Sequence, residues 1–171
     1  MMITQTTASN TGSIKSRGLG HPHELIMTMG MTRRPVLWKT YLEDFPNLTV
    51  EILEDFNPRY NCIAWSLGIN ERWVWNEIDF NSDGDASLSE FIDFYRKRGY
   101  TVTSNESDAD VALFGKKKGM KISVKHAARR DKELPQFWSS KMGQGAIIRH
   151  RTLSEMADSP YGVPVVLFKR L

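Results

Sequence analysis

The single cysteine, Cys62, is the residue of this sequence best suited to covalent chemistry. Pro58 stands just upstream, where a helix cannot yet have begun, and Asn61 is a favoured N-cap residue type. With Gly68 as a stop signal, these residues predict a short helix that has Cys62 in its first turn. Free backbone N–H groups and the helix dipole favour a thiolate there. The alternative is a small buried apolar residue, because free cysteine is among the most buried types.

A base for this thiol is offered by His126, in a run that is typical of a strand. Strict alternation places His126 on the same apolar face as Val124 and Ala128. A cysteine nucleophile needs a base and a third group that orients the base. The polar residues on the next predicted strand are Gln136, Ser139 and Ser140. We therefore predict that Cys62 and His126 face each other across a cleft, with Ser139 or Gln136 as the third group. A packed core histidine is the alternative.

A second chemical motif, residues 79–90, resembles an EF-hand calcium loop, with oxygen donors at loop positions 1, 3, 5, 9 and 12. These donors are Asp79, Asn81, Asp83, Ser87 and Glu90. Ala86 stands where a branched apolar residue is usual, and the sequence has no second loop of this kind. The same Ser87-to-Glu90 spacing is also a helix capping box. We expect the chain to fold without calcium or another cofactor, and calcium binding is the alternative.

The elements that must position these residues follow from the hydrophobic pattern. A helix over 88–98 is predicted after the capping box, and Gly99 ends it. A short strand is expected at 49–53 and a helical turn at 154–157. The other predicted strands are Tyr100–Thr103, Val111–Lys116, Lys121–Arg130, Phe137–Met142 and Val163–Lys169. Their short connections favour antiparallel pairing of neighbours, so we expect an α+β fold with helices packed on an antiparallel sheet.

Composition is that of a globular protein, with 40% hydrophobic and 25% charged residues among 171. We expect a disordered tail at 1–30 and one domain at 31–171. Residues 1–114 carry a charge of −6 and residues 115–171 carry +9. The basic half suits an acidic partner, but Lys116–Lys118 reads as a solvated turn, so nucleic acid is not expected. Lacking a signal peptide and any apolar run of about 20 residues, the chain is expected in the cytoplasm, away from membranes.

Two family resemblances add to these hypotheses. The stretch Tyr60–Trp65 resembles the cysteine motif of NlpC-type peptidases, which are papain-like hydrolases with a cysteine helix before a histidine-bearing sheet. The resemblance implies Cys62 as nucleophile, His126 as base and Tyr60 as an oxyanion-site donor. Asn61 departs from that motif, where the family has aspartate.

The blocks "YNCIAWSLG", "KHAARR" and "FWSSKMG" also resemble a family of small uncharacterised proteins, over roughly residues 35–171. That resemblance implies no activity.

Three functions are therefore predicted. The first is a papain-like cysteine hydrolase or acyltransferase that acts on a peptide or other amide. The second is a non-catalytic binding or interaction module, in which Cys62 belongs to the core, the tryptophans Trp73, Trp75 and Trp138 pack, and the basic sheet face binds an acidic partner. The third is a calcium-responsive protein built on residues 79–90.

Overall fold

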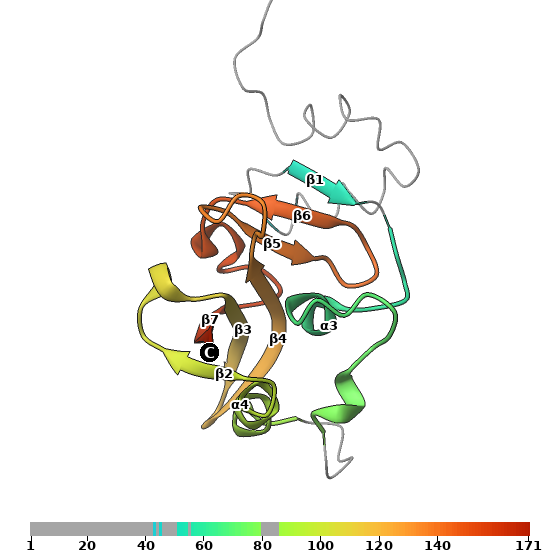
Figure 1. The fold of residues 1–171 in the computed structure, drawn as a ribbon. Helices are drawn as coiled ribbons and strands as arrows, with labels where there is room; N and C mark the ends of the chain where they lie inside the picture. The colour runs from blue at the N-terminus through green and yellow to red at the C-terminus, as the bar shows by residue number, and fades with distance from the viewer. Residues whose placement is uncertain (1–42, 44, 46–50, 55, 80–85) are drawn as a thin grey trace, which may run out of the picture.

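The computed structural model describes residues 43, 45, 51–54, 56–79 and 86–171. Its centre is an antiparallel sheet of seven strands in the order β1-β6-β5-β4-β3-β7-β2. The strands are β1 (Glu51–Glu54), β2 (Tyr100–Thr103), β3 (Val111–Lys118), β4 (Lys121–Arg130), β5 (Trp138–Lys141), β6 (Ile147–His150) and β7 (Val163–Arg170). Figure 1 shows how the sheet turns from β1 at one edge to β2 at the other.

One face of the sheet is covered by α3 (Cys62–Ser66) and α4 (Leu88–Arg96). The Asn61 side chain accepts a hydrogen bond from the Ala64 N–H and so caps α3, as the sequence predicts. Ser87 and Glu90 form the predicted capping box of α4. Both helices pack their apolar side chains against strand residues of this face, which we call the helix face.

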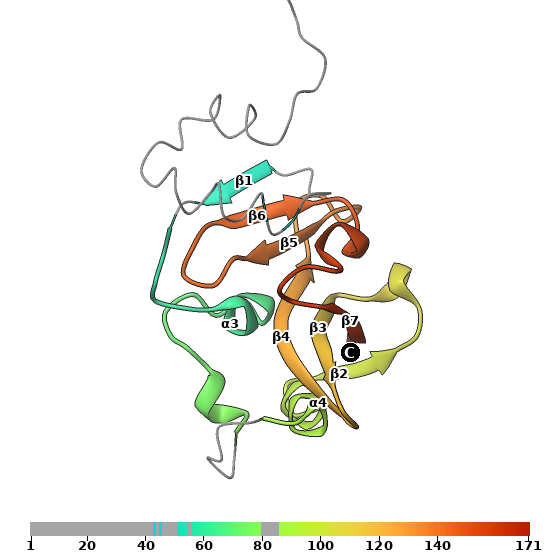
Figure 2. The same ribbon diagram turned by 180° about the vertical axis from the view of Figure 1, so that it is seen from behind.

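The opposite face carries a second apolar cluster, built by residues of β3 to β6 and by the 3-10 helix η3 (Leu153–Met156). Figure 2 shows the η3 segment and its connection to β7 on this side. Phe114 and Trp138 are fully buried there, and Tyr161 packs against the cluster. We call this side the η3 face. A buried side chain of the central strands therefore belongs to one of two separate environments.

The predicted α+β class is confirmed, and the expected helical turn near residue 154 is η3. Two features differ from the prediction. Strand β6 was not predicted, because its residues include Arg149 and His150, which are polar yet buried. In addition, β2 and β3 do not pair with each other, because β7 lies between them and pairs with both. The last strand of the chain therefore completes the sheet.

Among the described residues, we find no helix with the length and apolar character that a membrane span requires. The predicted tail at 1–30 lies outside the described residues, as do Asn81 and Asp83 of the predicted calcium loop.

Candidate functional site

Cys62 lies where the sequence places it, as the first residue of α3, but its thiol is buried against β4. Burial raises the pKa of the thiol to about 11, and hydrogen bonds from the backbone at Ala127 and Ile63 offset this only in part. The helix start therefore does not produce a thiolate at neutral pH. Burial outweighs it, because the charged sulfur would lose its hydration.

His126 lies on the η3 face, and the sheet separates it from Cys62. Its ring stacks on Tyr161 with centroids 4.1 Å apart and contacts Phe114 at 5.8 Å. Neither ring nitrogen has a hydrogen-bond partner in the described part of the chain. Burial, together with the charge that His150 would carry, lowers the pKa of His126 to about 3. The predicted Cys62–His126 pair is therefore not formed.

A β-bulge explains why alternation misplaced this histidine. Phe114 pairs with His126, but the next residue, Gly115, pairs with Val124, so the register shifts by one residue. Val124 thus faces the helices while His126 faces the opposite side. An added Cβ at Gly115 would come within 2.9 Å of the Ser123 carbonyl oxygen, so only glycine fits this close approach. A glycine inside a predicted strand was the signal that strict alternation should not have been applied.

The other predicted catalytic residues do not surround His126 either. Gln136 is exposed in the turn before β5. Ser139 faces the helices, where its hydroxyl accepts a hydrogen bond from the Trp65 indole at 3.3 Å. The Tyr60 hydroxyl lies 3.4 Å from the Glu54 carboxylate, and burial followed by that carboxylate raises its pKa to about 12. Tyr60 is therefore committed to Glu54, which leaves it a poor donor to an oxyanion near Cys62.

The histidine that does have a serine partner is His150, the last residue of β6. Its Nε2 lies 3.0 Å from the Ser140 hydroxyl, and its Nδ1 lies 2.9 Å from the carbonyl oxygen of Thr152. The carbonyl requires a proton on Nδ1, so Nε2 accepts from Ser140. Both side chains are fully buried within the η3 face. This set satisfies the polar groups of a core, where both side chains are shielded from solvent.

The calcium motif is only partly described. Glu90 accepts from the Ser87 N–H at 2.7 Å, so both residues serve the capping box of α4. Asp79, the first donor of the motif, is 9% exposed. Within the described residues, no group of three or more His, Cys, Asp or Glu side chains is arranged to hold a metal ion.

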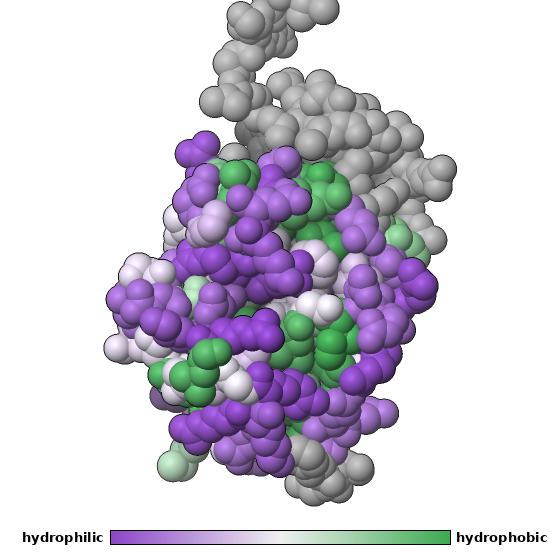
Figure 3. Space-filling model, in the orientation of Figure 1, coloured by the Kyte–Doolittle hydropathy of each residue, from purple (hydrophilic) through white to green (hydrophobic). Residues whose placement is uncertain are grey.

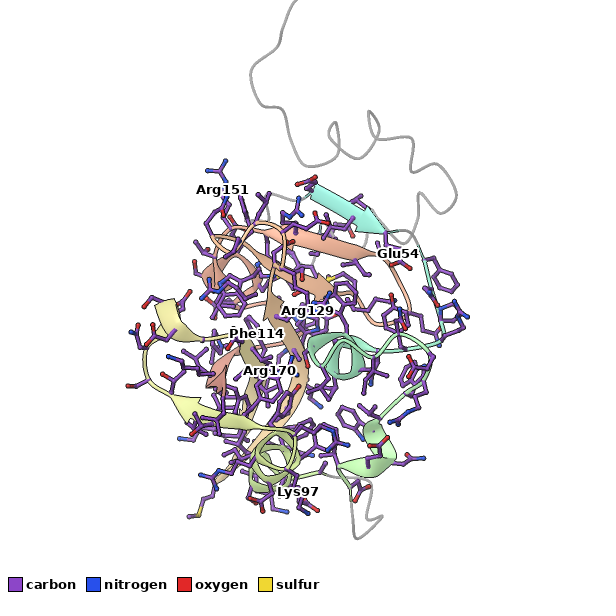
Figure 4. The ribbon with its side chains drawn as sticks, in the orientation of Figure 1. Glu54, Lys97, Phe114, Arg129, Arg151 and Arg170 are labelled. Carbon is purple, nitrogen blue, oxygen red and sulfur yellow. The ribbon has the colours of Figure 1, made fainter. Side chains whose placement is uncertain are left out.

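A pocket of about 340 Å³ lies on the helix face, between α3 and the strands β1, β4, β5 and β6. We call it the Arg129 pocket. Its lining includes Trp65, Ser139, Leu53 and Ile147. The charged residues in its lining are Glu54, Arg129, Asp131, Lys132, Glu133 and Arg149. Figure 4 shows Arg129 next to α3 and Glu54 near the end of β1. In Figure 3 an apolar patch in the region between α3 and α4 is bordered by hydrophilic residues.

The guanidinium of Arg129 is held by one neighbour. Its Cζ lies over the Trp65 indole, 3.4 Å from the ring centroid, and its Nη1 donates to the Trp65 carbonyl oxygen at 2.9 Å. The Nε atom is buried and has no partner in the described chain, and Arg129 forms no ion pair with a described residue. Burial lowers the pKa of Arg129, yet a guanidinium stays charged at neutral pH. An oriented cation with unused donors is suited to an anionic ligand.

The second arginine of this pocket, Arg149, differs because its charge is already balanced. Its Nε donates to Asp131 at 2.8 Å and its Nη1 to Glu51 at 2.7 Å, and Glu133 lies 3.4 Å from Nη2. Burial opposes ionisation of Asp131, but the hydrogen bond from Arg149 and those from two backbone N–H groups outweigh burial and lower the pKa of Asp131. Arg149 therefore fixes β6 to the neighbouring loop and leaves Arg129 as a half-buried cation of the pocket that forms no ion pair with a described residue, although the charge of Asp131 acts on it at longer range.

Lys141 lies on the same face as Cys62 but is engaged elsewhere. Its ammonium donates to the carbonyl oxygens of Gly143 and Gly145, at 2.9 and 2.5 Å, and lies 5.2 Å from the Tyr60 ring centroid. Burial lowers its pKa to about 8. These bonds close the turn between β5 and β6, so Lys141 is a structural cation and a poor base for the thiol.

Taken together, these features define an α+β protein with a seven-stranded antiparallel sheet and a charged pocket on its helix-covered face. The chain belongs to the family described as Domain of unknown function (DUF7689), whose model matches residues 51–169. No curated protein and no solved structure matches the chain.

Proposed function

We propose that this protein is a non-catalytic binding module that holds the carboxylate of an acidic ligand in the Arg129 pocket. The observation that carries the proposal is the Arg129 guanidinium in the pocket lining, which Trp65 orients and which forms no ion pair with a described residue. A carboxylate in the pocket can accept charge-assisted hydrogen bonds from the guanidinium N–H groups that face the pocket. Because the stack on Trp65 fixes the guanidinium beforehand, little side-chain entropy is lost on binding.

This proposal is preferred to a papain-like cysteine hydrolase for two reasons. The hydrolase needs a thiolate and a base within hydrogen-bond reach. The thiol of Cys62 is buried with a raised pKa, and His126 lies on the other face of the sheet. Cys62 is then a small core residue at a helix start, as the second function predicted from the sequence, the non-catalytic binding module, requires.

The neighbouring residue supplies a matched control for the test. Arg130 also stacks on a tryptophan, 3.8 Å from the Trp138 ring centroid, but its Nε donates to the Ala109 carbonyl oxygen at 3.1 Å. Arg129→Met and Arg130→Met therefore remove the same charge and the same type of stack. Arg129→Met alone removes a donor that is free to bind a ligand.

N-acetylglycine, which carries a carboxylate and no amine, is the probe. Titrated into protein labelled with nitrogen-15, it should shift the Arg129 Nε–H and Trp65 indole N–H signals and saturate below about 10 mM. Binding should be lost in Arg129→Met and kept in Arg130→Met. The proposal is wrong if these signals do not move, or if Arg130→Met weakens binding as much as Arg129→Met.

A further inference from the structure

The charges of the Arg129 pocket do not all have the same sign, and pairing within the pocket decides which of them can meet a ligand. Arg149 is surrounded by three carboxylates, and two of them, Asp131 and Glu133, are the acids on its side of the pocket. Two cations, Arg129 and Lys132, form no ion pair with any residue described. One acidic residue of the lining, Glu54, likewise forms no ion pair with any residue described.

Glu54 lines this pocket and forms no ion pair with a described residue, although the charge of Lys141 acts on it at longer range. Its carboxylate accepts from the Asn57 amide at 3.3 Å and from the Tyr60 hydroxyl at 3.4 Å, and both of these donors are uncharged. Its negative charge is one reason that the pKa of Tyr60 is raised, after burial. Glu54 therefore presents a carboxylate at the β1 side, and Arg129 presents a guanidinium at the α3 side (Figure 4).

We infer that the ligand is a zwitterion, an amino acid or short unblocked peptide whose carboxylate meets Arg129 and whose ammonium group meets Glu54. The inference rests on the proposed function, because it adds an amine contact to the same pocket. The volume of about 340 Å³ is at the low end for small-molecule sites and suits a ligand of one or a few residues. A purely anionic ligand would place a negative charge near the Glu54 carboxylate, and this repulsion disfavours its binding.

The test compares four forms of one dipeptide, Ala-Ala: unblocked, N-acetylated, C-amidated and blocked at both ends. Affinities are measured on the wild-type protein by the same nitrogen-15 titration. The unblocked form should bind about 2- to 5-fold more tightly than the N-acetylated form, which is the range of one charged contact at a partly exposed site. The C-amidated and doubly blocked forms should not bind. Titration of alanine alone shows whether one residue spans the two charges.

Glu54→Gln provides the second arm. It should bring the two affinities together, because it removes the ammonium contact of the unblocked dipeptide and the repulsion that Glu54 exerts on the N-acetylated form. If the N-acetylated and unblocked forms bind equally to the wild-type protein, the zwitterion inference is wrong while carboxylate binding stands. If no form with a free carboxylate binds, the proposed function itself fails. The comparison on the wild-type protein decides this even if a variant does not fold.

Discussion

Acid should destabilise this protein well above the pH at which carboxylates are protonated, because two buried histidines are held uncharged. Burial lowers the pKa of His126 to about 3 and that of His150 to about 4, although the Thr152 carbonyl partly favours the charged form of His150. Both rings lie on the η3 face. In the unfolded chain each histidine titrates near pH 6.5. The unfolded state therefore binds protons that the native state excludes.

The sign and size follow from this difference. Stability is complete above about pH 6.5 and is lost as the pH falls from there toward the native pKa values. Each histidine contributes a slope of about 1.4 kcal/mol per pH unit. Between pH 6.5 and 4.5 the two together remove about 4–5 kcal/mol, which is a large part of the stability of a typical domain. Asp131, whose pKa is also lowered, adds its loss only below about pH 4.

Urea unfolding followed by tryptophan fluorescence, at intervals from pH 7.5 to 4.5, measures this dependence. His126→Phe is the informative variant, because the ring stack on Tyr161 remains and neither nitrogen had a partner in the described chain. It should keep wild-type stability at pH 7.5 and halve the slope. His150→Gln should instead cost stability at every pH, since His150 bonds Ser140 and Thr152. A flat wild-type profile, or an unchanged slope in His126→Phe, would refute the assignment of neutral buried histidines.

Two further predictions concern the motifs that the sequence made most prominent. Cys62 should resist a thiol-reactive probe in the native protein at pH 7 and react rapidly in denaturant, because its pKa is raised to about 11 and it is buried; rapid native labelling at mildly acidic pH would restore the nucleophile hypothesis. Calcium should leave the melting temperature unchanged, because Ser87 and Glu90 are engaged in the capping box; a calcium-dependent rise that is lost in Asp79→Ala would support the EF-hand reading instead.

Local signals in the sequence were sufficient for the helices and for most of the strands. Asn61 caps α3, Gly68 follows it with φ of 78°, and Ser87 with Glu90 begins α4. These features act over a few residues, through backbone hydrogen bonds and the conformational freedom of glycine. The α+β order and the position of Cys62 in the first turn were predictable for the same reason.

The composition of the site was decided by the tertiary structure. A single bulge at Gly115 sends His126 to the face opposite Cys62, and the pairing of β5 with β6 buries His150 beside Ser140. Arg129 becomes a candidate ligand-binding residue only because α3 brings Trp65 beneath it while the nearby acids bind Arg149. The face on which a strand residue lies and the ion pair that a charge forms depend on register between distant segments, so local sequence patterns cannot specify them.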